Sequence, residues 1–267
     1  MQRYRKVPVT GLAASFPRDD AVAAEEPLEI RLGDDPVSVT MRTPGDDYDL
    51  VAGFLYTEGI LAKREDLADL GYCADPENPD LRNIVRATLA PGLAPDVEKA
   101  RRRAFTSSSC GLCGKGSIEA VLACAPPLKD SARFSRALIA SLPERLGDAQ
   151  PTFDETGGLH AAGLFDRKGV LLCAREDIGR HNAVDKVIGR MFLDGKAPLP
   201  GTVLMVSGRA SFEIVQKALV ARIPALCAVS APSSLAVDLA RDSGMTLVGF
   251  LRGGKGNVYS GAERLPG

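Results

Sequence analysis

The stretch that decides the fold begins at Thr202-Val-Leu-Met-Val206, a continuous apolar run followed by a helix-compatible segment, Ser211–Ala221. The pattern repeats with Ala225-Leu-Cys-Ala-Val229 and then Ser233–Arg241, and Thr246-Leu-Val-Gly-Phe-Leu251 closes the series. Continuous apolar strands that alternate with helices are typical of a parallel sheet buried on both faces. These residues therefore predict an α/β domain.

Each of these predicted strands ends in a small polar turn: Ser207–Arg209, Ser230–Ser233 and Arg252–Gly256. Open α/β sheets bind ligands outside the carboxyl ends of their strands, and free N–H groups at helix starts bind anions. Together the turns predict a crevice for an anionic ligand, although each alone is compatible with ordinary turn chemistry. Neither Gly-x-Gly-x-x-Gly nor a Walker lysine is present, so neither standard nucleotide motif applies.

The region before these repeats adds further elements to the same domain. The apolar spacing predicts a helix over Ser131–Leu146, a hairpin made by Ala161–Phe165 and Gly169–Ala174, and a helix over Arg180–Phe192. The hairpin makes the sheet mixed. We therefore expect a mixed, largely parallel sheet with helices on both faces.

A dense polar cluster, Arg175–Lys186, separates the hairpin from the helix that follows it. Asp177 is a candidate helix cap, and Arg180 and His181 are candidates to face the crevice. A capped helix start with solvated charges is the alternative. His160 lies close to no cysteine or acid that would give it a role, so a structural and a functional role stay equally open.

The N-terminal half does not show the alternation of apolar strands and helices seen in the C-terminal half. Residues 1–26 have little periodicity and predict an extended arm, and residues 27–105 predict a small α+β domain. That domain's helix should be capped by Asp46 or Asp47 and end at Gly59. Its predicted elements are a hairpin of Leu28–Leu32 and Val37–Met41, a helix over Tyr48–Tyr56, and strands over Ala68–Cys73 and Asn83–Leu89. The larger domain is then 106–267.

That larger domain opens on a thiol loop, 106–116, which contains Cys110-Gly-Leu-Cys113 among glycine, serine and lysine. The apolar segment after it is helix-compatible, so a helix dipole and Lys115 favour the thiolate. Four interpretations compete: idle or disulfide-bonded thiols, half of a zinc site, a thioredoxin-like redox pair, and a sulfur carrier. Zinc needs a second ligand pair, and no other two cysteines or histidines have ligand spacing. We therefore expect no bound metal.

Composition limits the class of protein. The chain has 267 residues, 45% of them hydrophobic, and a net charge of -1. This balance argues against a protein that binds nucleic acid or a membrane surface. The chain contains neither an apolar run long enough to span a membrane nor a signal-peptide pattern. Six scattered cysteines fit a reducing cytoplasm better than a disulfide framework.

Several of these motifs together resemble the FdhD family of formate dehydrogenase accessory proteins. They are Ser109-Cys-Gly-Leu-Cys-Gly114, Arg175-Glu-Asp-Ile-Gly-Arg-His-Asn-Ala-Val-Asp-Lys186, Ser207-Gly-Arg209, Gly249-Phe-Leu-Arg-Gly-Gly-Lys255 and the N-terminal Pro44–Ile60. The match covers nearly the whole chain beyond the first two dozen residues.

The resemblance implies a sulfur carrier, here called a sulfurtransferase. Such a protein takes a persulfide from a cysteine desulfurase on Cys110, with Cys113 as the second cysteine of the pair. It passes the sulfur to the molybdenum bis(molybdopterin guanine dinucleotide) cofactor, before that cofactor enters the catalytic subunit of formate dehydrogenase. The resemblance also implies a cytidine-deaminase-like fold for the larger domain and a homodimer.

The cofactor-binding stretch that the resemblance implies is Phe250, Leu251, Arg252, Gly253, Gly254 and Lys255. The predicted crevice adds Arg209 and His181, and GDP or GTP would bind there as fragments of the cofactor. Two other functions stay open. One is a chaperone that binds the cofactor without carrying sulfur. The other is a zinc-dependent nucleobase hydrolase, for which the His/Cys-x-Glu and Pro-Cys-x-x-Cys motifs are missing.

Overall fold

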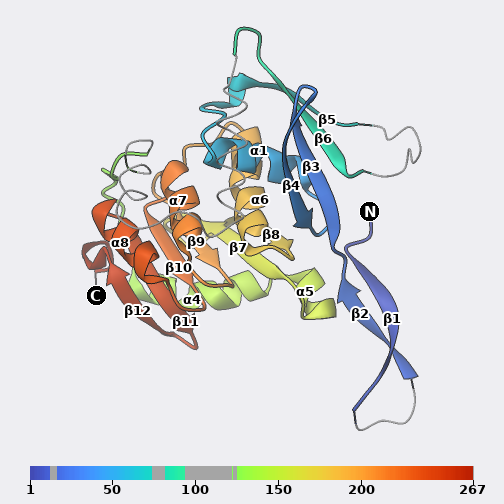
Figure 1. Cartoon of the computed structure of the whole chain (residues 1–267). Coiled ribbons are helices and arrows are strands. Elements are labelled where there is room, and N and C mark those ends of the chain that lie inside the picture. The colour runs from blue at the N-terminus through green and yellow to red at the C-terminus, as the bar shows by residue number, and fades with distance from the viewer. Residues whose placement is uncertain (13–16, 74–81, 94–121, 123–124, 267) are drawn as a thin grey trace.

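The structure is a computed structural model of the chain, and it describes residues 1–12, 17–73, 82–93, 122 and 125–266. Its larger sheet has the strand order β12-β11-β10-β9-β7-β8 (Figure 1). The strands are β7 (His160–Phe165), β8 (Leu171–Asp177), β9 (Val203–Val206), β10 (Ala225–Ala228), β11 (Thr246–Arg252) and β12 (Lys255–Ser260).

Helices cover this sheet on both faces, as the sequence predicted. Alternate residues of β9 point to opposite faces: Leu204 belongs to the apolar cluster on one face, and Val203 belongs to the cluster on the other. The first cluster includes α6 (Arg180–Leu193), α7 (Phe212–Val220) and α8 (Ser234–Asp242), and the second includes α4 (Arg136–Gly147). A short helix, α5 (Pro151–Thr156), was not predicted.

The sheet is mixed, but the expectation that it is largely parallel was wrong. Among the described strands, β9–β10 and β10–β11 pair in parallel, whereas β7–β8, β7–β9 and β11–β12 are antiparallel. Strand β12 escaped prediction because Lys255–Ser260 is largely exposed and does not alternate polar with apolar residues. Gly253 and Gly254 both have positive φ, which a tight two-residue hairpin turn requires.

Two expectations about helix starts were also wrong. The helix expected from Ser131 begins at Arg136, because the hydroxyl of Ser135 accepts a hydrogen bond from the Leu138 N–H and caps the helix there. Helix α1 (Asp47–Thr57) is not capped by a side chain. Asp46 occupies the N-cap position but forms an ion pair with Arg3, and Asp47 binds Arg42.

The N-terminal half forms a second sheet with the order β4-β3-β6-β5. Its strands are β3 (Glu26–Leu32), β4 (Asp35–Arg42), β5 (Leu67–Tyr72) and β6 (Ile84–Leu89), with a 3-10 turn, η1 (Arg64–Asp66), before β5. In the predicted arm, β1 (Tyr4–Thr10) and β2 (Pro17–Ala23) pair as an antiparallel ribbon that extends away from the body (Figure 1). A second 3-10 turn, η2 (Ala262–Arg264), lies near the C-terminus.

Helices α1 and α6 join the two halves at a very close crossing. A Cβ atom on Gly53 would lie 1.8 Å from the backbone oxygen of Asp185, and one on Gly189 would lie 1.8 Å from that of Asp49. Only glycine allows this approach. Buried residues of both halves, such as Leu28 and Val187, belong to one apolar cluster, so the core runs across the crossing.

Across the described residues, no helix combines the length and the apolar character needed to cross a membrane. The likeness of the larger domain to the cytidine-deaminase fold stays a prediction.

Candidate functional site

Strands β8, β9 and β10 end at one edge of the larger sheet, and β7 begins there. His160, the first residue of β7, pairs with Asp177 at the end of β8. Ala162 pairs with Val206 at the end of β9, and Val206 pairs with Ala228 at the end of β10. We call this the carboxyl edge. It is the edge at which the sequence placed a ligand.

Backbone hydrogen bonds hold the turns at the carboxyl edge against one another. The Ala210 N–H donates to the Ala231 carbonyl at 3.2 Å, and the Ser233 N–H donates to the Ala210 carbonyl at 3.0 Å. The Phe250 N–H donates to the Ser230 carbonyl at 3.1 Å. The turns after β9 and β10 are therefore neighbours, as predicted, and Phe250 adjoins them.

Ser207 fixes the turn after β9 to the start of β7. Its N–H donates to the Ala161 carbonyl at 2.9 Å, and its Oγ accepts from the Ala161 N–H at 2.9 Å. This two-way bond holds Gly208 and Arg209 beside His160. The Arg209 side chain is exposed, so it is free to meet a ligand.

Helices α6, α7 and α8 also begin at the carboxyl edge. Ser233 caps α8 by accepting a hydrogen bond from the Ala236 N–H. The N-cap residues of α6 and α7, Gly179 and Ser211, make no side-chain cap. First-turn N–H groups without a capping side chain can donate to an anion, which the helix dipole also favours.

His181 links the starts of α6 and α7. Its Nε2 lies 3.3 Å from the Ser211 hydroxyl and 3.8 Å from a carboxylate oxygen of Glu213. The nearby His181 ring lowers the pKa of Glu213 to about 2, so Glu213 is ionised at neutral pH. The structure thus brings together His181 and Arg209, which were predicted, with Glu213, which was not.

His160, whose role the sequence left open, also lies at the carboxyl edge. Burial is the main cause of its lowered pKa, and the nearby positive charge of Arg180 acts in the same direction. The imidazole is therefore largely neutral at neutral pH. The predicted hairpin, continued by one residue, sets His160 opposite the polar cluster at Asp177, and the antiparallel pairing of β7 with β9, which was not predicted, brings it beside the turn after β9.

The predicted stretch Phe250–Lys255 comprises the end of β11, the Gly253–Gly254 turn and the first residue of β12. Phe250 is 41% exposed and has a positive φ of 54°. Arg252 pairs with Lys255 across the Gly253–Gly254 turn, and both side chains are exposed. Between described residues, no hydrogen bond or ion pair joins Arg252 or Lys255 to Arg209 or His181.

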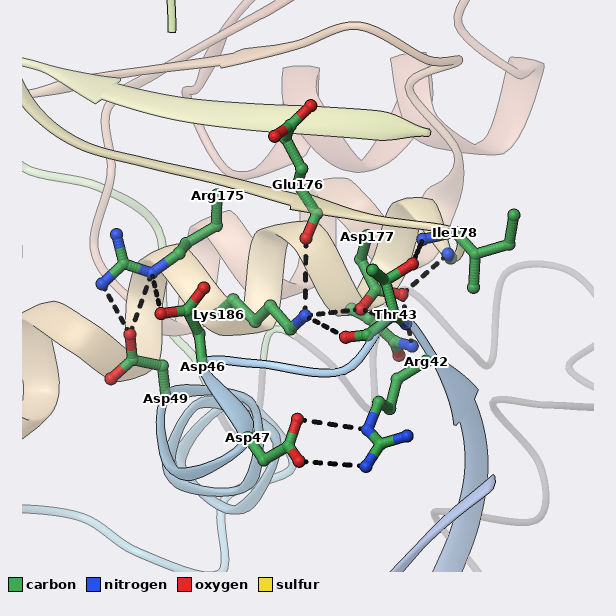
Figure 2. A network of polar contacts seen from close by, with 12 residues as sticks. Arg42, Thr43, Asp46, Asp47, Asp49, Arg175, Glu176, Asp177, Ile178 and Lys186 are labelled. Atoms are coloured by element: carbon green, nitrogen blue, oxygen red, sulfur yellow. Dashed lines mark hydrogen bonds and ion pairs between the residues drawn. The ribbon is translucent and has the colours of Figure 1, made fainter. Parts of the chain in front are cut away.

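The polar cluster Arg175–Lys186 divides between two tasks, and the first is to hold the N-terminal half in place (Figure 2). Lys186 Nζ lies 2.7 Å from a carboxylate oxygen of Asp177 and donates to the Thr43 carbonyl at 2.9 Å. Asp177 also accepts from the Thr43 N–H at 3.1 Å. Its other oxygen accepts from the Gly179 N–H and the Asn182 side-chain amide, so Asp177 holds the turn before α6, whose N-cap is Gly179, and also anchors the segment that leads into α1.

Two further ion pairs of this network involve acids at the start of α1. Arg42 makes two hydrogen bonds of 3.1 Å to Asp47, with both side chains buried. Arg175 binds Asp49 at 2.7 Å, and burial nevertheless raises the pKa of Asp49. Charged pairs shielded from water hold their partners in one geometry. The network explains why the Pro44–Ile60 and Arg175–Lys186 motifs are both rich in charge.

The second part of the cluster, Arg180 and His181, lies at the carboxyl edge. Arg180 Nε is buried and has no hydrogen-bond partner among the described residues. Neither Arg180 nor Arg209 forms an ion pair with another residue that the structure describes. Arg180 and Arg209 are thus positive groups without an ion-pair partner in the part of the chain that the structure describes, as an anion site needs.

Cys110 and Cys113 lie outside the described residues. Of the described cysteines, Cys173 and Cys227 are buried, and burial raises their pKa values to about 11 and about 12. They are inert thiols at neutral pH. Among the described residues, no three His, Cys, Asp or Glu side chains lie together in a group that could hold a metal ion.

Comparison with known proteins identifies relatives along the whole chain. The model of the FdhD/NarQ family matches residues 23–266. The sulfur carrier protein FdhD of Streptomyces avermitilis is 54% identical over 258 residues, which cover 93% of this chain and 90% of the relative. That of Mycolicibacterium paratuberculosis is 50% identical over 271 residues, which cover 99% of this chain and all of the relative.

A solved structure has the same fold. The crystal structure of a Desulfotalea psychrophila protein assigned as a formate dehydrogenase accessory protein superposes with a TM-score of 0.75 at 27% identity. The superposition covers 98% of each chain. Sequence and fold thus agree along nearly the full length, and this chain belongs to the FdhD/NarQ family.

Proposed function

We propose that this chain is a sulfur carrier in the maturation of formate dehydrogenase. It accepts a sulfur atom on Cys110 from the persulfide of a cysteine desulfurase. It then delivers that sulfur to the molybdenum bis(molybdopterin guanine dinucleotide) cofactor, before the cofactor enters the catalytic subunit. The observation that carries the proposal is the full-length likeness to proteins named sulfur carrier protein FdhD, in a chain with a Cys-x-x-Cys loop.

Loading of the carrier is a balanced thiol exchange. The Cys110 thiolate attacks the outer sulfur of the desulfurase persulfide, and the desulfurase cysteine leaves as a thiolate. One S–S bond forms as another breaks, so no outside oxidant or reductant is needed. Lys115, close in sequence, favours the attacking thiolate. The described Cys173 and Cys227 are poor rivals because their buried thiols stay protonated.

The carboxyl edge supports the second half of the proposal. A guanine dinucleotide carries pyrophosphate groups, which Arg209, His181 and the uncapped start of α7 suit by charge and by N–H donors. We propose that the stretch Phe250–Lys255 completes the site from the end of the β11–β12 hairpin. A homodimer in the cytoplasm remains part of the proposal.

Mass spectrometry tests the carrier directly. After incubation with a cysteine desulfurase and cysteine, the intact protein should gain one sulfur, and peptide mapping should place it on Cys110. Cys73→Ala, which removes a partly exposed cysteine elsewhere, should still gain it. Cys110→Ala should lose both the adduct and the activation of formate dehydrogenase while keeping its fold. Normal activation by Cys110→Ala would favour the chaperone that carries no sulfur.

Metal analysis separates this proposal from the zinc hydrolase. The purified protein should contain no stoichiometric zinc, because a four-ligand site needs a second ligand pair. One zinc per chain that is lost in both Cys110→Ala and Cys113→Ala would contradict the proposal and support a zinc protein.

A further inference from the structure

Two basic side chains meet over the backbone of Gly208 at the carboxyl edge. A Cβ atom on Gly208 would lie 3.3 Å from Nδ1 of His160 and 3.7 Å from the Cβ of Arg180. His160 comes from the start of β7, Arg180 from the start of α6, and Gly208 from the turn after β9. Three elements distant in sequence thus converge at one point. Gly208 is buried, and because it has no side chain, the His160 ring and the Cβ of Arg180 pack close to its backbone.

Most of the charges around this point are positive, and among the described residues neither Arg180 nor Arg209 has an ion-pair partner. Arg180, His181 and Arg209 all act on His160, and each disfavours the imidazolium. Asp177 acts the other way, and its carboxylate is already bound to Lys186. Arg180 Nε is a buried donor that no described residue accepts from. Buried donors are rarely left without a partner, and an anion bound here would give Arg180 Nε the acceptor that the described residues do not supply.

We propose that His160 and Arg180 form an anion subsite beside Gly208, which takes a phosphate or pyrophosphate group and adds a proton to His160 as the group binds. This inference rests on the proposed function, because it names the part of the carboxyl edge that holds the charged end of the ligand. The proton comes from solvent. In the free protein, Arg180, His181 and Arg209 disfavour the protonated imidazole of His160. A bound anion attracts that imidazolium and offsets their effect.

The direction of the pH effect follows from this charge balance. An anion stabilises the protonated imidazole, so binding raises the pKa of His160 from its lowered value in the free protein. The affinity for the anion must then increase as the pH falls. The increase occurs between the pKa of His160 in the complex and its lower pKa in the free protein. Glu213, which pairs with His181, stays ionised throughout because its pKa is about 2.

Calorimetry with inorganic pyrophosphate tests the subsite at about pH 6 and about pH 8, the range in which histidine titrates. The gain in affinity at the lower pH should be roughly three- to tenfold larger for the unmodified protein than for His160→Gln, since one pKa unit corresponds to a factor of ten. The ligand's own protonation cancels in this ratio. Arg180→Gln should bind roughly tenfold or more weakly at both pH values, because it loses a charge-assisted hydrogen bond.

Arg241→Gln is the matched control for Arg180→Gln. Arg241 is an exposed arginine in the last turn of α8, at the opposite end from the carboxyl edge, and its removal should leave the affinity unchanged. An equal pH response in His160→Gln and the unmodified protein would overturn the proposal, as would unchanged binding by Arg180→Gln.

A second probe keeps the test valid if His160→Gln does not fold. Sulfate keeps its charge over this range, so its affinity for the unmodified protein should be higher at the lower pH, and equal affinities would overturn the proposal. The sulfur carrier is tested separately, by the adduct on Cys110. If the protein gains the adduct but fails these binding tests, the subsite is wrong and the sulfur-carrier function stands. If it passes the binding tests but gains no adduct, the sulfur-carrier function is wrong and the anion subsite stands.

Discussion

The Figure 2 network and the carboxyl edge draw on the same twelve-residue cluster, Arg175–Lys186, yet they treat charge in opposite ways. In the network, the side chains of Lys186 and Asp177 are at most 1% exposed, and each meets its partner. At the carboxyl edge, Arg180 and His181 are partly exposed, and Arg180 has no ion-pair partner among the described residues.

The difference shows how a single motif can serve the fold and a ligand at once. A buried charge that loses its partner is strongly destabilising, so the network residues act mainly on stability. An exposed cation such as Arg209, which has no ion-pair partner among the described residues, contributes little to stability and keeps its full charge for a ligand. Substitutions in the two regions should therefore separate folding from binding.

The largest effect is expected from Lys186→Met in the network. It leaves the Asp177 carboxylate buried without its counter-charge, so the free energy of unfolding should fall by about 3 kcal/mol or more. Urea denaturation measures the change. Lys196→Met is the matched control, since Lys196 is 61% exposed, and it should cost about 1 kcal/mol or less. Equal losses in the two variants would remove the distinction between the regions.

The next effect concerns the helix crossing that supports the network. Gly53→Ala places a Cβ atom 1.8 Å from a backbone oxygen, so α1 and α6 must move apart, at a cost of about 1–3 kcal/mol. Gly147→Ala in α4 is the control, because nothing lies within 4 Å of its Cβ position, and it should be neutral or slightly stabilising. If Gly53→Ala unfolds at the same urea concentration as Gly147→Ala, the close crossing is not needed.

The smallest effect belongs to the carboxyl edge. The pKa of Glu213 is lowered from 4.5 to about 2. Its contribution to the free energy of unfolding is therefore fully present above pH 4.5 and is lost as the pH falls toward 2. Glu213 is about one-third exposed, so this contribution should be under about 1 kcal/mol. Over that acid range the unmodified protein should lose slightly more stability than Glu213→Gln. Parallel acid-denaturation curves for the two proteins would show that the His181–Glu213 pair has no effect.

Local patterns predicted the parts of the fold that depend on local chemistry. The apolar runs around Leu204 and Leu226 identified the strands of the sheet, since their residues are buried on both faces. Strand β12 was missed because its residues are mostly polar and exposed. The crossing of α1 and α6 could not be predicted either, because nothing in the sequence around Gly53 indicates which backbone approaches it.

The site was predictable where it depends on strand ends and unpredictable where it depends on pairing. His181 and Arg209 follow from their places beside strands and helix starts. The hydrogen bond between Asp49 and Arg175 joins residues 126 positions apart in the sequence, so no local pattern predicts it. His160 comes to lie beside the turn after β9 through the antiparallel pairing of β7 with β9, which no local pattern indicates. The roles of Cys110 and Cys113 stay predictions from sequence.

Calorimetric titration with GDP tests most directly the central claim that the carboxyl edge and its hairpin bind the guanine nucleotide end of the cofactor. Arg252→Ala and Lys255→Ala should each weaken GDP binding by about ten- to a hundredfold, since a charge-assisted hydrogen bond contributes roughly 1.5–3 kcal/mol. Both variants should unfold at the same urea concentration as the unmodified protein, because both side chains are exposed. Unchanged GDP affinity in both variants would contradict the claim for the hairpin and move the site toward His181 and Arg209.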